Sequence, residues 1–155
     1  MSHKFLALGM VVLATGVYGL AAAEPTLAQK GTMKAWQEQI DGQLKFANDN
    51  CGTKITATVD WDAFFKVDLD KASKSGGAVS VGQYCGDAIA AVSNLCTISK
   101  DGKEAVTKHI TSVACKYGGP GKRSIALAKG VFTFTVDFQV GSNSVDIRQD
   151  LAKKM

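Results

Sequence analysis

The chain has 155 residues, of which 46% are apolar and 21% are charged, a balance typical of a globular protein rather than of a disordered or fibrous one. Eighteen basic and fourteen acidic residues give a net charge of +4, well short of the excess of a dedicated nucleic-acid binder. Two prolines and no long polar tract argue against a linker-rich chain.

Residues 1–23 have the pattern of a secretory signal peptide. Lys4 supplies the charged start, an apolar stretch begins at Phe5, and three alanines at 21–23 form a cleavage site. An uncleaved membrane anchor is the alternative, but the apolar segment is short and contains glycines. No later stretch is long and apolar enough to cross a membrane. We therefore expect a secreted or periplasmic protein, residues 24–155, folded as a single domain with no transmembrane segment.

The first half of this domain predicts a helix and then a strand. Thr32 can cap a helix that runs to about Asn48, because apolar residues recur there at three- and four-residue steps. Residues 55–61 alternate between apolar and polar side chains, which predicts a half-buried strand. Asp60 or Asp62 then caps a short turn of helix, and residues 70–79 are polar and glycine-containing, which is typical of a loop.

A second long helix is expected to begin at Ser80, because Gln83 stands three residues later in a capping-box pattern. Asp101-Gly102 is a turn signal. Residues 104–117 are ambiguous between helix and strand, and their β-branched residues favour mainly strand. A short strand at 125–127 and a clear alternating strand at 132–138 follow, and Asn143 can cap a last helix.

Short turns between the three late strands favour an antiparallel arrangement. One face of the resulting sheet is aromatic and requires a cover, which the amphipathic helices supply. The predicted fold is therefore a two-layer α+β domain, with amphipathic helices packed on an antiparallel β-sheet that ends in a three-strand meander.

Four cysteines lie after the leader: Cys51, Cys85, Cys96 and Cys115. An even number in a small exported domain predicts two disulfides, and the spacings lack the close pairs of a zinc site. Cys85 and Cys96 are eleven residues apart on one predicted helix, roughly 16 Å, so they cannot bond each other. Because the chain turns back at Asp101-Gly102, we predict the pairs Cys85–Cys115 and Cys51–Cys96.

The sequence favours a protein without catalysis. His109 is the only histidine left after cleavage, no nucleophile elbow precedes it, and the paired cysteines leave no free thiolate. The aspartates around Asp60 and Asp68 lack the spacing of a calcium loop, and the glycines do not form a phosphate-binding loop. We therefore expect no catalytic residue, no metal and no cofactor.

A basic excess in the late part of the chain indicates an acidic partner. Residues 100–130 contain seven basic and two acidic residues, a net charge of +5. The candidate partner-binding residues are Lys108, Lys116, Lys122 and Arg123, and Lys108 and Lys116 share one face of the predicted strand. The partner would be an acidic protein, an anionic glycan or a lipid head group, and not a nucleic acid. The alternative is a solvated sheet whose edges are guarded by lysines.

Three functions remain open. The first is an exported, monomeric, non-catalytic binding or accessory protein, inhibitor-like towards an acidic envelope or host partner. The second is a small-ligand pocket protein or enzyme with a site between the first helix and the sheet, formed by Trp36, Trp61, Asp60 and His109, although core packing is the favoured interpretation of both tryptophans. The third is a structural envelope component, which would oligomerise.

Overall fold

The computed structural model describes residues 25–72 and 79–155. The predicted signal peptide and most of the predicted loop at 70–79 lie outside the described residues. The described elements are, in order, α1 (Leu27–Cys51), β1 (Thr56–Val59), α2 (Trp61–Phe65), α3 (Leu69–Ala72), α4 (Val81–Ile98), α5 (Lys100–His109), β2 (Ser112–Tyr117), β3 (Ser124–Ala128), β4 (Val131–Val136) and α6 (Ser144–Ala152). No helix among these residues is long and apolar enough to cross a membrane.

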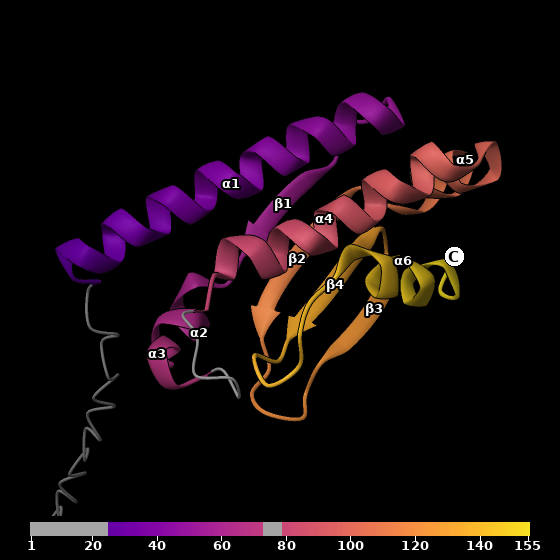
Figure 1. The fold of residues 1–155 in the computed structure, drawn as a ribbon. Helices are drawn as coiled ribbons and strands as arrows, with labels where there is room; N and C mark the ends of the chain where they lie inside the picture. The colour runs from indigo at the N-terminus through magenta and orange to yellow at the C-terminus, as the bar shows by residue number, and fades with distance from the viewer. Residues whose placement is uncertain (1–24, 73–78) are drawn as a thin grey trace, which may run out of the picture.

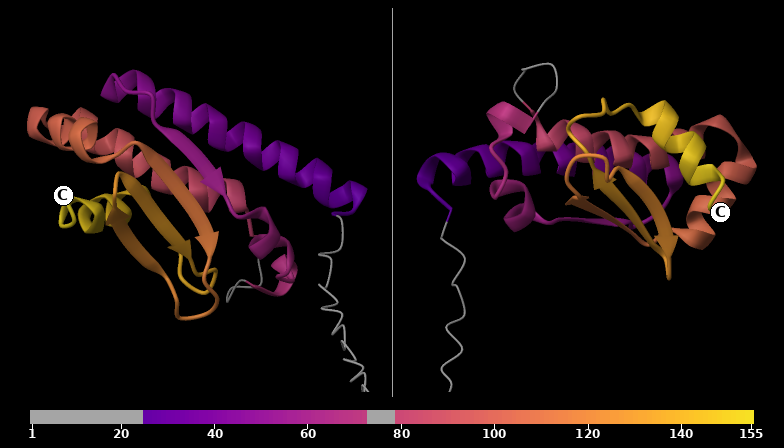
Figure 2. Two further views of the ribbon diagram at one scale, coloured as in Figure 1. Left: turned by 180° about the vertical axis from the view of Figure 1, so that it is seen from behind. Right: turned by 90° about the horizontal axis from the view of Figure 1, so that it is seen from below.

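The elements form two layers, a sheet and a layer of helices (Figure 1). Helices α4 and α6 cover one face of the sheet, α1 packs beside α4, and the other face of the sheet is open when the molecule is seen from behind (Figure 2). The open face consists mostly of threonine, serine and alanine side chains, which do not require a cover. The predicted two-layer α+β fold is therefore confirmed.

The predicted antiparallel meander is wrong in its strand order. The sheet is mixed, in the order β1-β2-β4-β3; β1 and β4 both run parallel to β2, and only β3 and β4 form an antiparallel hairpin. After β2, a connection of six residues leads to β3, which is not adjacent to β2 in the sheet. Strand β4 then returns to fill the position between β2 and β3. Burial explains this order, because Phe132 and Phe134 of β4 are fully buried while Ile125 and Leu127 of β3 are only half-buried.

The prediction of a strand over 104–117 is wrong for its first half, which forms helix α5. Ser99 caps this helix, and its hydroxyl accepts a hydrogen bond from the backbone N–H of Gly102 at 3.0 Å. Val106 is fully buried on the face that packs against α4. The cap and the buried face together outweigh the β-propensity of the threonines, and the strand begins only at Ser112.

The other helix signals are confirmed, with one shift. Ser80 caps α4 and Asn143 caps α6, each side chain accepting a hydrogen bond from the backbone three residues on. Helix α1 begins earlier than Thr32, because Thr26 forms a complete capping box with Gln29. The helix ends at Cys51, and Gly52 follows in the left-handed conformation with φ of 71°.

Helix α4 is the centre of the core, and both disulfides attach to it. Cys51 at the end of α1 bonds Cys96 near the end of α4, and Cys85 near the start of α4 bonds Cys115 of β2, as predicted. All four cysteines are buried and none is free. The bonds therefore join α4 to the neighbouring helix and to the sheet, as expected of a chain folded in an oxidising compartment.

Candidate functional site

Three aromatic rings form a stack where α1 crosses the end of β1. The rings of Trp36 and Trp61 are 6.5 Å apart between centroids and nearly parallel, and Phe65 stacks on Trp61 at 6.1 Å. All three side chains are half-buried. The structure thus brings together the two tryptophans that the sequence singled out, and it adds Phe65, which the sequence placed in the short helix without a role.

A hollow of about 430 Å³ opens beside this stack. It lies between the first half of α1 and the α2–α3 segment, rather than between α1 and the sheet as predicted. Its lining residues are Ala28, Gln29, Thr32, Trp36, Phe65, Val67, Asp68, Leu69 and Val79. Six of the nine lining residues are apolar and three, Gln29, Thr32 and Asp68, are polar, which is the chemistry of a site for a mainly apolar ligand.

Of the four predicted pocket residues, Trp36 lines this hollow, whereas Trp61, Asp60 and His109 do not. Asp60 caps α2, its carboxylate accepting a hydrogen bond from the backbone N–H of Ala63 at 3.1 Å. His109 is the last residue of α5 and lies at the opposite end of the sheet from Trp61, because β1 and β2 are parallel and His109 precedes β2 whereas Trp61 follows β1. The predicted group of four residues is therefore not one site.

The four candidate partner-binding residues are also dispersed. Lys108 belongs to α5, so the prediction that it shares a strand face with Lys116 is wrong. Lys116 is exposed on the open face of the sheet, and Lys122 lies in the loop that follows β2. Arg123 points the other way, towards the helix layer, where its guanidinium lies 5.9 Å from the centre of the buried Phe134 ring.

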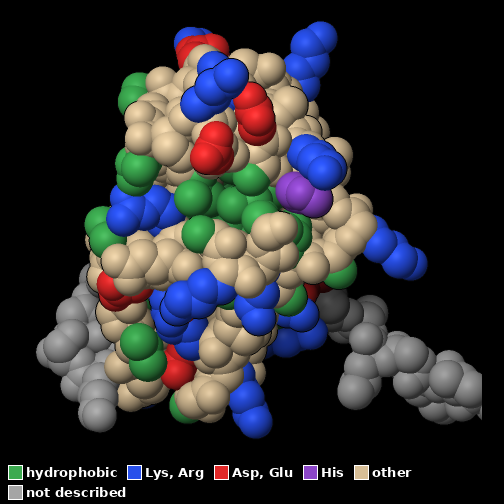
Figure 3. Space-filling view, turned by 90° about the vertical axis from the view of Figure 1, so that its right-hand side faces the viewer, with side chains coloured by type: hydrophobic (Ala, Val, Ile, Leu, Met, Phe, Trp, Pro, Cys, Tyr) green, Lys and Arg blue, Asp and Glu red, His purple; other side chains and the backbone are tan. Residues whose placement is uncertain are grey.

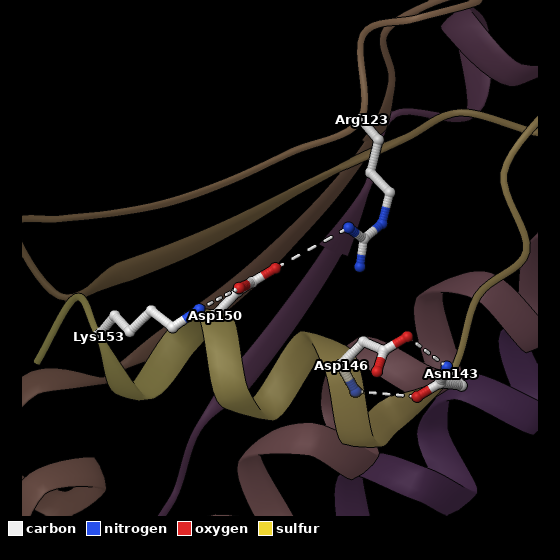
Figure 4. A network of polar contacts seen from close by, with 5 residues as sticks. All are labelled: Arg123, Asn143, Asp146, Asp150 and Lys153. Carbon is white, nitrogen blue, oxygen red and sulfur yellow. Dashed lines mark hydrogen bonds and ion pairs between the residues drawn. The ribbon is translucent and has the colours of Figure 1, made fainter.

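Arg123 reaches α6, where it faces the carboxylate of Asp150 (Figure 4). Its Nη1 is 3.9 Å from Oδ2 of Asp150, and Asp150 also accepts a hydrogen bond from Nζ of Lys153 at 3.0 Å. A hollow of about 290 Å³ opens at this point, lined by Arg123, Ser124, Ile125, Asp150, Lys153 and Lys154. We call these six residues the β3–α6 groove.

The β3–α6 groove has an excess of positive charge. Three cations line it against one carboxylate, and the β3 hairpin itself, residues 122–131, contains no acidic residue. Lys and Arg side chains gather on the lower half of the face that Figure 3 shows, which is the side of the molecule where β3 and the end of α6 lie. The hydrogen bond and the charge of Lys153 are the main influences that lower the pKa of Asp150; burial acts against them, and the charges of Arg123 and Lys154 lower this pKa further.

Arg123 is only partly satisfied within the groove. Its side chain is 25% exposed, and its buried Nε makes no hydrogen bond within the described part of the chain. The contact with Asp150 at 3.9 Å is too long for a hydrogen bond. A guanidinium that has lost water without gaining close partners can accept a further carboxylate at little additional desolvation cost.

A second polar cluster lies where β2 and β4 end. The buried Asp137 accepts hydrogen bonds from the backbone N–H groups of Gly121 at 2.7 Å and Gln139 at 2.9 Å. Burial raises the pKa of Tyr84 and of Tyr117, and the charge of Asp137 raises both further. Asp137 holds the glycine loop and the chain after β4 in place, which is a structural role.

No group of three or more histidine, cysteine or acidic side chains within residues 25–72 and 79–155 is arranged to hold a metal ion. The comparisons with known proteins identify no relative: no protein-family model, curated protein or solved structure matches the chain significantly. The candidate sites are the hollow beside Trp36 and the β3–α6 groove.

Proposed function

We propose that the protein is an exported, non-catalytic binding protein whose partner is an acidic protein segment, bound at the β3–α6 groove. The observation that supports this most directly is the composition of the groove, in which Arg123, Lys153 and Lys154 outnumber Asp150. The partly buried guanidinium favours a carboxylate over a lipid head group, because a flat membrane cannot reach a cation that faces a groove between a strand and a helix.

Two features of the molecule support a binding or accessory role, including an inhibitor-like one. The single small domain is held by two disulfides, a construction common in exported proteins that act outside the cell. The aromatic side chains of the sheet fill the core, so the exposed side chains of the late strands are small or polar, and those of the adjoining loops include basic residues.

Binding to poly-L-glutamate tests this function. We expect the triple variant Arg123→Gln/Lys153→Gln/Lys154→Gln to elute from a poly-L-glutamate matrix at a clearly lower NaCl concentration than the wild type, because screened attraction falls with each cation removed. The matched control removes three exposed lysines elsewhere, Lys34, Lys45 and Lys100, each paired with an acid on its own helix. Equal elution of the two triple variants would overturn the proposal.

A small-ligand protein is the second candidate, and the hollow beside Trp36 favours it. Its volume of about 430 Å³ lies within the range of small-molecule sites. A neutral apolar dye such as Nile red should quench tryptophan fluorescence and lose affinity in Trp36→Ala, whereas Ile98→Ala, at an exposed apolar residue outside the hollow, should leave the affinity unchanged. Unchanged dye affinity in Trp36→Ala would dismiss this candidate.

A further inference from the structure

We propose that the acidic partner binds as an added β-strand along the free edge of β3. This inference rests on the proposed function and states how the β3–α6 groove would be used. Strand β3 is the last strand of the sheet and, among the described residues, pairs only with β4 (Figure 2). An extended segment can pair with such an edge through backbone hydrogen bonds, while its side chains confer specificity.

The hairpin geometry determines which backbone groups of β3 face the free edge. The two-residue turn at Lys129 and Gly130 makes Ala128 and Val131 a hydrogen-bonded pair, so Ala126 and Ser124 also face β4. The backbone N–H and C=O groups of Ile125 and Leu127 consequently point away from the sheet. Neither residue has a backbone hydrogen bond to anything beyond the ladder in the described part of the chain.

The groove lies along this edge on the helix side. Ser124 and Ile125 of β3 are among its lining residues, together with the cations of Arg123, Lys153 and Lys154. Side chains of an added strand alternate between the two faces of the sheet, so every second one would enter the groove. Acidic residues at those positions would place their carboxylates beside three cations, one of which lacks close partners.

Charge excludes a second copy of this chain as the preferred occupant. Pairing β3 with β3 of another copy would bring Lys122, Arg123 and Lys129 of both chains together, with no acidic residue in either hairpin. The other edge strand is less suited to an acidic strand. Strand β1 lies beside α1, and the hollow at its start is lined by two acidic and two basic residues, Asp41, Asp49, Lys45 and Lys54.

A peptide with alternating glutamate and valine, Ac-Thr-Glu-Val-Glu-Val-Glu-Thr-NH2, tests the strand directly. Two further peptides have the same charge but are N-methylated on the backbone, one at every glutamate and the other at both valines. If the added strand runs antiparallel to β3, the peptide residues whose side chains lie in the groove also direct their N–H groups at β3. If it runs parallel to β3, the alternate residues, whose side chains lie on the opposite face of the sheet, direct their N–H groups at β3. We expect one N-methylated peptide to lose at least about tenfold in affinity and the other to bind like the parent.

Protein variants test the same edge. Ile125→Pro removes an N–H that faces outward without breaking the ladder to β4, and Ile125→Ala is its control for the lost side chain. We expect the proline variant to lose at least about tenfold more peptide affinity than the alanine variant. Where the proline variant does not fold, the N-methylated peptides decide the question alone.

The outcomes separate this inference from the proposed function. If all three peptides bind equally and Arg123→Gln weakens all of them, the partner is acidic but is not an added strand, and only this inference is overturned. If the variant Arg123→Gln binds each peptide as tightly as the control variant Lys45→Gln does, the groove is not the site and both proposals fail. A peptide-free dimer in sizing chromatography that Ile125→Pro dissociates would show that a second copy occupies the edge, which also overturns the inference.

Discussion

The pKa of a carboxyl group in this protein depends on its burial and its contacts in the fold more than on its neighbours in the sequence. Asp87 and Asp150 both lie on helices, at α4 and α6, and both are carboxylates with ordinary neighbours in the sequence. Burial is the main influence on Asp87 and raises its pKa, and the Ser142 hydroxyl acts against it. The hydrogen bond from Lys153 lowers the pKa of Asp150. The two residues should therefore affect stability with opposite signs as the pH changes.

We predict that Asp87→Asn raises the free energy of unfolding at pH 7. Because the folded-state pKa of Asp87 lies above the ordinary value of 3.8, the folded protein binds this proton more tightly than the unfolded chain. The resulting stabilisation is complete below pH 3.8 and is lost as the pH rises through the folded-state pKa. Wild type and variant should therefore differ little at pH 3 and most at neutral pH, as measured by urea unfolding across this range.

Asp150→Asn is the opposite case and serves as the comparison. Its folded-state pKa is lowered, so its contribution to stability is present above the ordinary pKa of 3.8 and is lost as the pH falls through the lowered value. This variant should be less stable than the wild type at pH 7. A pH dependence with the same sign in both variants would contradict the assignment of burial as the main influence on Asp87.

At the level of elements, the close packing of helices depends on two glycines, Gly82 in α4 and Gly102 in α5. A β-carbon on Gly82 would lie 3.1 Å from the α-carbon of Trp36, so the absence of a side chain lets α1 approach α4. A β-carbon on Gly102 would lie 2.3 Å from the carbonyl oxygen of Leu95. The turn between α4 and α5 is therefore possible only with a residue as small as glycine at 102.

We predict that Gly102→Ala destabilises the protein by about 1–3 kcal/mol, because the new methyl group overlaps backbone that cannot move freely. Gly42→Ala is the matched control, since Gly42 lies within α1 and a β-carbon there meets no atom within 4 Å. The control should gain up to about 1 kcal/mol from better helix propensity. Urea unfolding of the oxidised proteins measures both changes, and a Gly102→Ala variant as stable as the control would refute the predicted overlap.

For the whole molecule, the two disulfides tie helix α1 and strand β2 to helix α4. The Cys51–Cys96 bond closes a loop of 45 residues and the Cys85–Cys115 bond a loop of 30. The first loop contains the connection from β1 through the α2–α3 segment into α4. The second contains the return from α4 through α5 to β2. The constraint on the unfolded chain is therefore of similar size for the two bonds.

Removing either disulfide, as Cys51→Ala/Cys96→Ala or Cys85→Ala/Cys115→Ala, should lower the free energy of unfolding by about 2–5 kcal/mol. The chain-entropy term depends only on the logarithm of loop length, so the two variants should agree within about 1 kcal/mol. Guanidinium unfolding of each variant, with the fully reduced wild type as reference, checks this. A variant with an unchanged unfolding midpoint would show that its bond does not constrain the unfolded chain.

Much of this protein was determined by short stretches of sequence. Ser80 and Asn143 predict the helices that they cap, and residues 132–138 predict β4 by alternation, because caps and periodic burial depend on residues only a few positions apart. The disulfide pairing was also predicted from the sequence: the length of one helix forbids a bond between Cys85 and Cys96, and the reversal of the chain after that helix brings Cys115 towards Cys85. The proximity of Trp36 and Trp61 was predicted as well.

Only the tertiary structure decided which elements became neighbours. Strand β4 lies beside β2 because its phenylalanines gain more from the buried centre of the sheet than Ile125 and Leu127 of β3 would. The parallel pairing of β1 with β2 places His109 at the opposite end of the sheet from Trp61, and Arg123, beside β3, reaches α6. The β3–α6 groove joins residues that lie about thirty positions apart, and no local pattern could bring them together, because their contact depends on the packing of the whole core.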